Sequence, residues 1–139
     1  MLQPHPKSPG LEVGITSDMI RRLVDGFYAH VKRDAELGPV FAAHVQDWGE
    51  HLDKMCAFWS SVTLMTGGYK GRPMEVHAQL PEISDALFLR WLQLFQRAAR
   101  EHCPPEAASL FIDRAARIAD SLKLGIAIRR LSGGQVVAD

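Results

Sequence analysis

The stretch YKGRPMEVHAQLP, from Tyr69 to Pro81, holds one histidine, His77, between two prolines. Proline is tolerated in the first turn of a helix but cannot continue its interior, so Pro73 can open a helix that Pro81 must close. A helix of about two turns is too short to be stable alone. Either the imidazole of His77 lies in a surface turn, or the short helix positions it to bind a ligand.

The composition is that of one ordinary globular domain. The chain has 139 residues, of which 47% are hydrophobic and 23% are charged, and this length allows a substantial core. Sixteen basic residues balance sixteen acidic ones, so no strong field attracts nucleic acid or an anionic membrane. No apolar run approaches the roughly 20 residues of a membrane span. We therefore expect neither nucleic acid nor a membrane among the partners.

Two features of the sequence predict a cytoplasmic location. The first fifteen residues lack the apolar stretch of a signal peptide. Cys56 and Cys103 are too few for a disulfide scaffold, and each lies in a helical pattern. Two reduced thiols in a cytosolic protein are the simplest interpretation of that pattern.

Apolar residues recur at helical spacing along most of the chain, which predicts an all-α protein with about five main helices. Thr16, Ser17 and Asp18 are candidates to cap the first long helix, and Asp47 and Ser84 can cap two more. The first of these helices is expected to end at residues 37–39, where Pro39 can open a short segment that carries the next apolar residues.

The two ends of the chain have a different composition from the middle. Residues 1–15 are rich in proline and predict a flexible arm, whereas residues 132–139 predict a flexible tail. The globular domain is expected to span residues 16–131.

The middle of the chain departs from a simple bundle. The run of long helices is interrupted by a loop with Gly67, Gly68 and Gly71 and by a two-turn helix. Interruptions of this kind usually make room for a bound group. The flanking helices are rich in large apolar side chains, namely Phe41, Met55, Phe58, Trp59, Phe88, Trp91 and Phe95. These side chains form either an ordinary core or the wall of a binding site.

Polar groups among these apolar faces favour a binding site. Tyr28 shares the apolar face of its helix, and a buried phenol needs a hydrogen-bond partner. His51 lies one turn before Met55, and Trp91 offers an indole N–H. A flat apolar cofactor held by one protein ligand would account for them, since haem iron takes a histidine on one side and needs donors on the other to bind a polarised diatomic ligand.

Several short motifs follow one another in a recognisable order. They are FY (27–28), LGPVF (37–41), WGEH (48–51), FW (58–59), Y-x-G-x-P-x-x-x-H (69–77), LP (80–81) and W-L-x-L-F (91–95). In this order and spacing they resemble the group III truncated haemoglobins, over roughly residues 17 to 130 of the chain. The resemblance implies a truncated globin fold, a two-over-two helical sandwich that encloses one haem b.

The resemblance also implies roles for individual residues. His77 becomes the axial ligand of the haem iron, which is the metal of the site. Tyr28 and Trp91 become distal hydrogen-bond donors, and His51 gates the distal side. The candidate haem-binding residues are His77, Phe41, Met55, Phe88, Trp91, Tyr69 and Arg72.

The implied function is reversible binding of oxygen and other small diatomic ligands such as nitric oxide or carbon monoxide. Donors that face the ligand slow its release, which favours retention or redox chemistry over transport. Nitric oxide dioxygenase or peroxidase-like activity would need an external reductant, because the chain carries no flavin or nicotinamide motif. A reductase would therefore be a further partner.

A helical bundle without haem is the alternative. His44, Asp47 and His51 are spaced by three and four residues, which on one continuous helix would place three metal ligands on one face. Asp47 can instead cap a helix, with His44 in the preceding segment. A purely structural bundle belongs to the same alternative.

His77, which lies between Pro73 and Pro81, gives the first prediction. His77→Gly is expected to abolish stable haem binding, because it removes the iron ligand, and added imidazole is expected to restore it. The visible spectrum of the purified variant measures both effects. A normal Soret band in the variant without imidazole would refute the assignment.

Overall fold

The computed structural model describes residues 3–69 and 84–138, and helices are the only regular elements in these two ranges. In chain order they are α1 (Pro9–Glu12), α2 (Ser17–Arg33), α3 (Leu37–His44), α4 (Trp48–Leu64), α6 (Asp85–His102) and α7 (Pro105–Ala138). The predicted all-α class is confirmed. The two-turn helix predicted around His77 lies outside the described residues.

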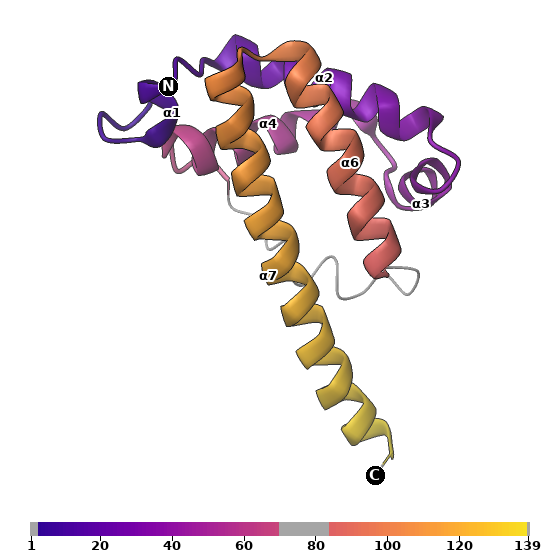
Figure 1. The fold of residues 1–139 in the computed structure, drawn as a ribbon. Helices are drawn as coiled ribbons and strands as arrows, with labels where there is room; N and C mark the ends of the chain where they lie inside the picture. The colour runs from indigo at the N-terminus through magenta and orange to yellow at the C-terminus, as the bar shows by residue number, and fades with distance from the viewer. Residues whose placement is uncertain (1–2, 70–83, 139) are drawn as a thin grey trace.

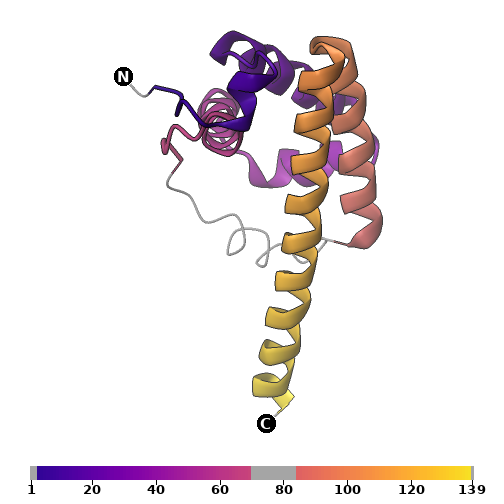
Figure 2. The same cartoon turned by 60° about the vertical axis from the view of Figure 1, so that its left-hand side comes forward.

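The long helices form two pairs. α6 and α7 run antiparallel and lie side by side in both views, with α2 and α4 behind them in Figure 1 (Figures 1 and 2). α2 packs mainly on α6 and α4, and α6 packs on α7. Gly26 lets α2 approach α6 closely, because a Cβ at that position would clash with the ring of His102. The core therefore lies where these four helices meet.

Three helices begin where the sequence predicts. The side chains of Thr16, Asp47 and Ser84 each accept a hydrogen bond from the backbone N–H three residues further on, at 3.2, 3.1 and 3.2 Å. Each bond satisfies one of the backbone donors that the first turn of a helix leaves free. The predicted caps of α2, α4 and α6 are confirmed.

Aromatic rings occupy the centre of the core. Phe95 of α6 is 1% exposed. Its ring is stacked on Trp59 of α4, with centroids 4.9 Å apart, and contacts Phe27 of α2 edge-on at 5.3 Å. Trp59 in turn contacts Phe111 of α7 at 5.7 Å. One connected set of rings therefore joins all four long helices.

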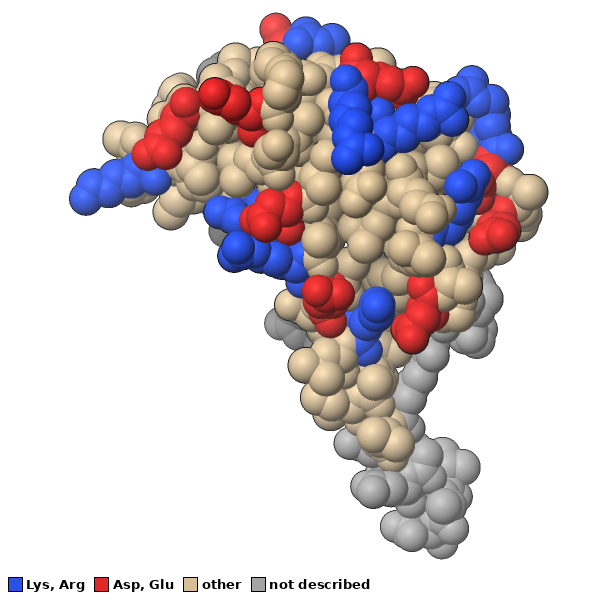
Figure 3. All heavy atoms as spheres, in the orientation of Figure 1, with Lys and Arg blue, Asp and Glu red and all other residues tan. Residues whose placement is uncertain are grey.

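The surface carries both signs of charge. Figure 3 shows lysine and arginine side chains interspersed with acidic ones over one face of the molecule. Within the described ranges, no helix combines the length and the apolar character that a membrane crossing requires.

The N-terminal segment differs from the flexible arm that we expected. The backbone N–H of His5 donates to the carbonyl oxygen of Leu64 at 2.8 Å, and α1 packs against α4. Gly10 permits this contact, since a Cβ there would lie 2.5 Å from the carbonyl oxygen of Thr63. Ile15 is also buried, at 2% exposed. A buried isoleucine and a glycine without a side chain thus fix a proline-rich segment on the end of α4.

The last helix extends further than expected. We predicted that the globular domain ends at residue 131, but α7 continues to Ala138. Gly133 and Gly134 each weaken a helix by about 1 kcal/mol without forbidding it, and no proline interrupts this stretch. The C-terminal half of α7 projects beyond the other helices (Figures 1 and 2).

α2 also ends earlier than the stop that we expected at residues 37–39. The carboxylate of Asp34 accepts hydrogen bonds from the backbone N–H groups of Glu36 and Leu37, at 3.1 and 2.9 Å, and from Nε of Arg90 at 2.7 Å. The Arg90 guanidinium holds the pKa of Asp34 below its ordinary value, and the two backbone donors add to this effect. Asp34 therefore sets the corner between α2 and α3 and ties it to α6.

This corner gives the second prediction. Because the pKa of Asp34 is lowered, its carboxylate stabilises the fold above its ordinary pKa of about 4, and that stabilisation is lost as the pH falls through the folded-state pKa. Asp34→Asn should reduce the free energy of unfolding by on the order of 1 kcal/mol at pH 7, and by less at pH 3. Urea denaturation at both pH values measures the difference.

Asp113→Asn is the matched control, because Asp113 is an exposed carboxylate whose ion pairs with Arg114 and Arg117 lie on the surface. It should change stability less than Asp34→Asn at pH 7. A loss in Asp34→Asn that is equal at both pH values would show that charge has no part in the corner.

Candidate functional site

Four rings from three helices meet beside the first turns of α4. The Tyr28 ring centroid lies 5.6 Å from that of Phe41, 5.9 Å from Trp48 and 5.0 Å from His51. Phe41 and Trp48 are stacked, with centroids 6.4 Å apart and planes 26° apart. We call Tyr28, Phe41, Trp48 and His51 the ring cluster. The structure thus brings together three predicted site residues from α2, α3 and α4.

Tyr28 is a buried phenol. Its side chain comes from the apolar face of α2, and the residue is 5% exposed. Burial raises the pKa of Tyr28 above its ordinary value, with a smaller contribution from the Cys56 thiol. Among the described residues the hydroxyl has no hydrogen-bond partner, although a buried phenol usually finds one.

His51 presents a second unpaired polar group to the same place. Its Nε2 atom is buried and has no hydrogen-bond partner among the described residues. Burial lowers the pKa of His51, and the nearby charge of Lys54 lowers it further. The imidazole is therefore neutral at pH 7, with one nitrogen that donates and one that accepts.

Trp91 and Met55 lie next to the ring cluster. The Phe27 ring contacts Tyr28 on one side, at 4.8 Å, and Trp91 on the other, at 5.5 Å. Trp91 is therefore joined to the cluster through Phe27. Met55 is partly buried against the same core. The structure therefore places Trp91 one ring away from Tyr28, and Met55 one helical turn after His51 on α4.

Phe88 lies apart from the ring cluster. It packs with Ala119 and Ile126 in a second group of buried apolar residues between α6 and α7. Its helical spacing to Trp91 made it a candidate, but the start of α6 faces α7 at this point. The structure therefore places this predicted haem-binding residue in a separate apolar group.

Tyr69 lies at the far end of α4 from the ring cluster. Its backbone N–H donates to Oγ of Ser61 at 3.0 Å, and its ring meets that of Phe58 edge-on at 5.1 Å. Arg72 and His77, the other predicted haem-binding residues, lie outside the described residues.

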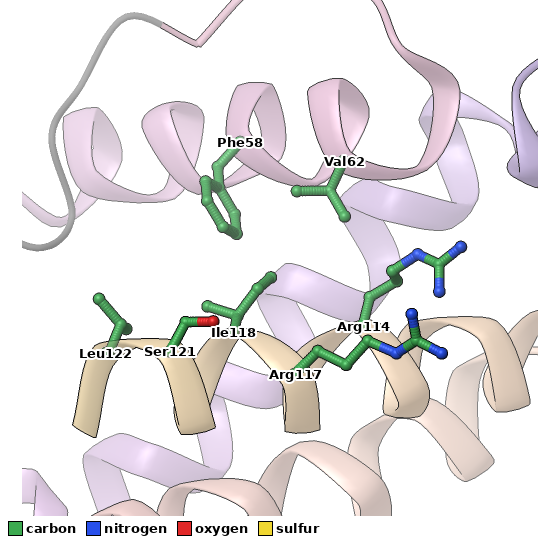
Figure 4. A pocket seen from close by; sticks show the side chains of 7 residues that line it. All are labelled: Phe58, Val62, Arg114, Arg117, Ile118, Ser121 and Leu122. Carbon is green, nitrogen blue, oxygen red and sulfur yellow. The ribbon is translucent and has the colours of Figure 1, made fainter. Parts of the chain in front are cut away.

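A cavity of about 380 Å³ opens between α4 and α7. Phe58 and Val62 point into it from α4 toward Ile118, whereas Arg114 and Arg117 extend at one side (Figure 4). The described residues that line it are Phe58, Val62, Arg114, Arg117, Ile118, Ser121 and Leu122. Phe58, which lines this apolar cavity, also contacts Tyr69. No residue of the ring cluster is among the lining residues.

The alternative metal site does not form as one helical face. His44 ends α3, Asp47 caps α4, and His51 lies within α4, so a break in the helix separates the first ligand from the last. Across residues 3–69 and 84–138, no three histidine, cysteine or acidic side chains gather closely enough to hold a metal ion.

Sequence reasoning missed two residues of this region. Trp48 entered only as the first residue of the WGEH motif, yet it contacts every other ring of the cluster. Its position three residues before His51 is the signal that could have found it, because residues three apart lie on one helical face. Phe58 was assigned to the large apolar side chains of the flanking helices, but it joins Tyr69 to the cavity of Figure 4.

The ring cluster is suited to a small polar ligand. The rings of a tyrosine and a histidine lie together among aromatic neighbours, and the buried, unpaired Nε2 of His51 carries a free-energy cost. A ligand that accepts or shares hydrogen bonds would remove this cost. The donor set therefore fits the distal side of a haem, where a diatomic ligand needs donors.

The chain is similar in sequence and in fold to proteins of known family. No family model matches it. The group 3 truncated hemoglobin ctb of Campylobacter jejuni is 32% identical over 109 residues, which span 76% of this chain and 86% of that protein.

Solved structures give the same picture. The crystal structure of group III truncated hemoglobin from Campylobacter jejuni matches with a TM-score of 0.76 and 31% identity, over 81% of this chain and 91% of that one. The crystal structure of the group II truncated hemoglobin from Bacillus anthracis matches with a TM-score of 0.66 and 24% identity, over 85% of this chain and 92% of that one. The crystal structure of the hemoglobin from Chloroflexus aurantiacus matches with a TM-score of 0.65 and 23% identity, over 83% of this chain and 96% of that one. The last two show likeness of fold alone.

The unpaired phenol gives the third prediction. Tyr28→Phe should change the unfolding free energy of the cofactor-free protein by less than about 1 kcal/mol, because the variant keeps the packed ring and the hydroxyl makes no hydrogen bond to the described residues. Urea denaturation measures this change. Tyr69→Phe is the control, since Tyr69 is only half-buried and its change should be small. A larger loss of stability in Tyr28→Phe would mean that the hydroxyl has a hydrogen-bond partner in the fold.

Proposed function

This chain belongs to the group III truncated haemoglobins, and from that premise we propose that it binds haem b with His77 as the iron ligand and with Tyr28 and His51 facing a small gaseous ligand. The predicted family and the truncated globin fold are confirmed. Haem and oxygen binding follow from membership of the globin family.

One observation carries the proposal for the distal side. The ring centroids of Tyr28 and His51 lie 5.0 Å apart, and Nε2 of His51 is buried without a partner among the described residues. A structural core would pair or exclude such groups. An absent ligand that completes their hydrogen bonds explains why they are retained.

The apolar neighbours would have a complementary task. Phe41, Met55 and Trp91 would exclude water from the ligand, and a low local dielectric strengthens each hydrogen bond made there. Haem, when bound, supplies an iron centre that coordinates a diatomic ligand. His77 would fix its position, and Arg72 and Tyr69 belong to the same motif.

The buried donors favour retention of the ligand over transport. Hydrogen bonds to a ligand that carries partial charge slow its dissociation. The same donors suit redox chemistry with nitric oxide or a peroxide, for which an external reductase is needed. We also propose a cytoplasmic location, which is supported by two cysteines, Cys56 and Cys103, that are both free.

The visible spectrum of the purified protein tests the proposal directly. A Soret band that shifts on reduction and again on addition of carbon monoxide is expected. A protein that takes up no haem under reconstitution would overturn the proposal, whatever the state of its distal residues.

Kinetics of the distal variants give the fourth prediction. Losing a charge-assisted hydrogen bond from Tyr28 or Trp91 costs about 1.5–3 kcal/mol, which speeds dissociation of dioxygen about ten- to hundredfold. Carbon monoxide carries little charge, so its dissociation should change far less. Stopped-flow measurement on Tyr28→Phe and Trp91→Phe determines both rates.

His51→Ala separates gating from holding. If His51 gates entry, this variant should mainly alter association rates and leave dissociation of dioxygen close to that of the parent. Parent-like dissociation of both gases from Tyr28→Phe and Trp91→Phe would rule out the distal-donor assignment even where haem binds normally.

A further inference from the structure

Trp48 lies against the polar pair of the ring cluster and is partly open to solvent. It is the first residue of α4 and is half-buried. Its inner side meets the rings of Tyr28 and His51, with centroids at 5.9 and 5.8 Å, and is stacked on Phe41. One half-buried side chain at the corner between α3 and α4 therefore contacts both Tyr28 and His51.

A lysine from another helix holds this indole on its outer side. Nζ of Lys32, in the last turn of α2, lies 4.4 Å from the centroid of the Trp48 ring. Tryptophan is the best aromatic partner for a cation, and contacts of this kind are attractive when the cation lies within about 6 Å of the ring. Trp48 is thus fixed from inside by rings and from outside by an ammonium group.

We propose that Trp48, held closed by Lys32, is the gate through which small ligands reach Tyr28 and His51. The inference rests on the proposed function, and it deepens that function by naming the side from which the ligand enters. Neither Trp48 nor Lys32 is needed to bind the ligand itself. Their effect should fall on entry, not on retention.

The local structure allows such a gate to open at little cost. Trp48 lies in the first turn of α4, where backbone hydrogen bonds are incomplete and the cap at Asp47 supplies one of them. Residues 45–47 before it are not helical. Rotation of the indole would break its stack on Phe41 and its contact with Lys32, but would leave Tyr28 in the core.

Association of carbon monoxide tests the gate, since a neutral ligand is not steered by the charge of Lys32. Lys32→Met should speed association about two- to fivefold, the factor that an exposed cation–π contact supplies. Trp48→Ala removes the ring as well and should speed it at least about fivefold. Flash photolysis of the haem-bound proteins at pH 7 measures these rates.

Arg33→Met is the matched control. Arg33 precedes Asp34 at the same end of α2 and is exposed, so the variant loses the same charge without a ring contact. Its association rate should equal that of the parent. Normal haem binding with unchanged association in Lys32→Met and Trp48→Ala would overturn the gate, whereas a parent protein without a Soret band would overturn both proposals. If Trp48→Ala fails to fold, Lys32→Met decides alone.

Water access to His51 gives a second readout that does not depend on ligand kinetics. NMR titration of the carbon monoxide complex measures the pKa of His51, which burial lowers first and Lys54 second. Trp48→Ala should raise that pKa toward its ordinary value, because water reaches the imidazole. Lys32 and Lys54 remain in this variant, so the rise reports solvent and not charge. An unchanged pKa would show that Trp48 does not shield the site.

Discussion

The structure depends on keeping the imidazole of His51 partly buried beside the buried ring of Tyr28. Nε2 of His51 has no partner among the described residues, and a buried group of that kind costs about 1–3 kcal/mol. Other interactions must offset that cost. Aromatic pairs contribute about 0.5–1.5 kcal/mol each beyond the area that they bury, and rings of α2, α3 and α4 contact Tyr28 and His51. Apolar packing around the site therefore offsets the cost of the polar group at its centre.

α2, α3 and α4 must keep their relative positions for Tyr28, Phe41 and His51 to meet. Phe95 fixes α6 against α2 and α4 through Phe27 and Trp59. α3 has few buried side chains of its own, and its start is tied to α6 by the contacts of Asp34 with Arg90. An ion pair at the edge of the fold therefore positions the helix that brings Phe41 to the cluster.

The sequence predicted the parts of this architecture that depend on local chemistry. Caps such as Asp47, and the burial of Tyr28 on an apolar helical face, follow from residue type and spacing. The packing of Gly10 on Thr63 and the separation of Phe88 from the ring cluster did not, because they depend on how helices meet. The central position of Trp48 was missed for the same reason. A stripe of apolar residues predicts which face is buried, but not which neighbour it meets.

A hydroxyl without a hydrogen-bond partner has nothing polar to fix its direction, so ring packing must do this. The Tyr28 ring meets its four aromatic neighbours edge-on, with planes at 64° to Phe27, 69° to Phe41, 61° to Trp48 and 84° to His51. Edge-to-face contacts around the ring leave it little room to turn. The position of the hydroxyl oxygen is therefore set before any ligand arrives, so that only rotation of the O–H bond about the C–O axis remains to be ordered when a hydrogen bond forms. Burial supplies the strength of the interaction, and the orientation of the rings supplies its geometry.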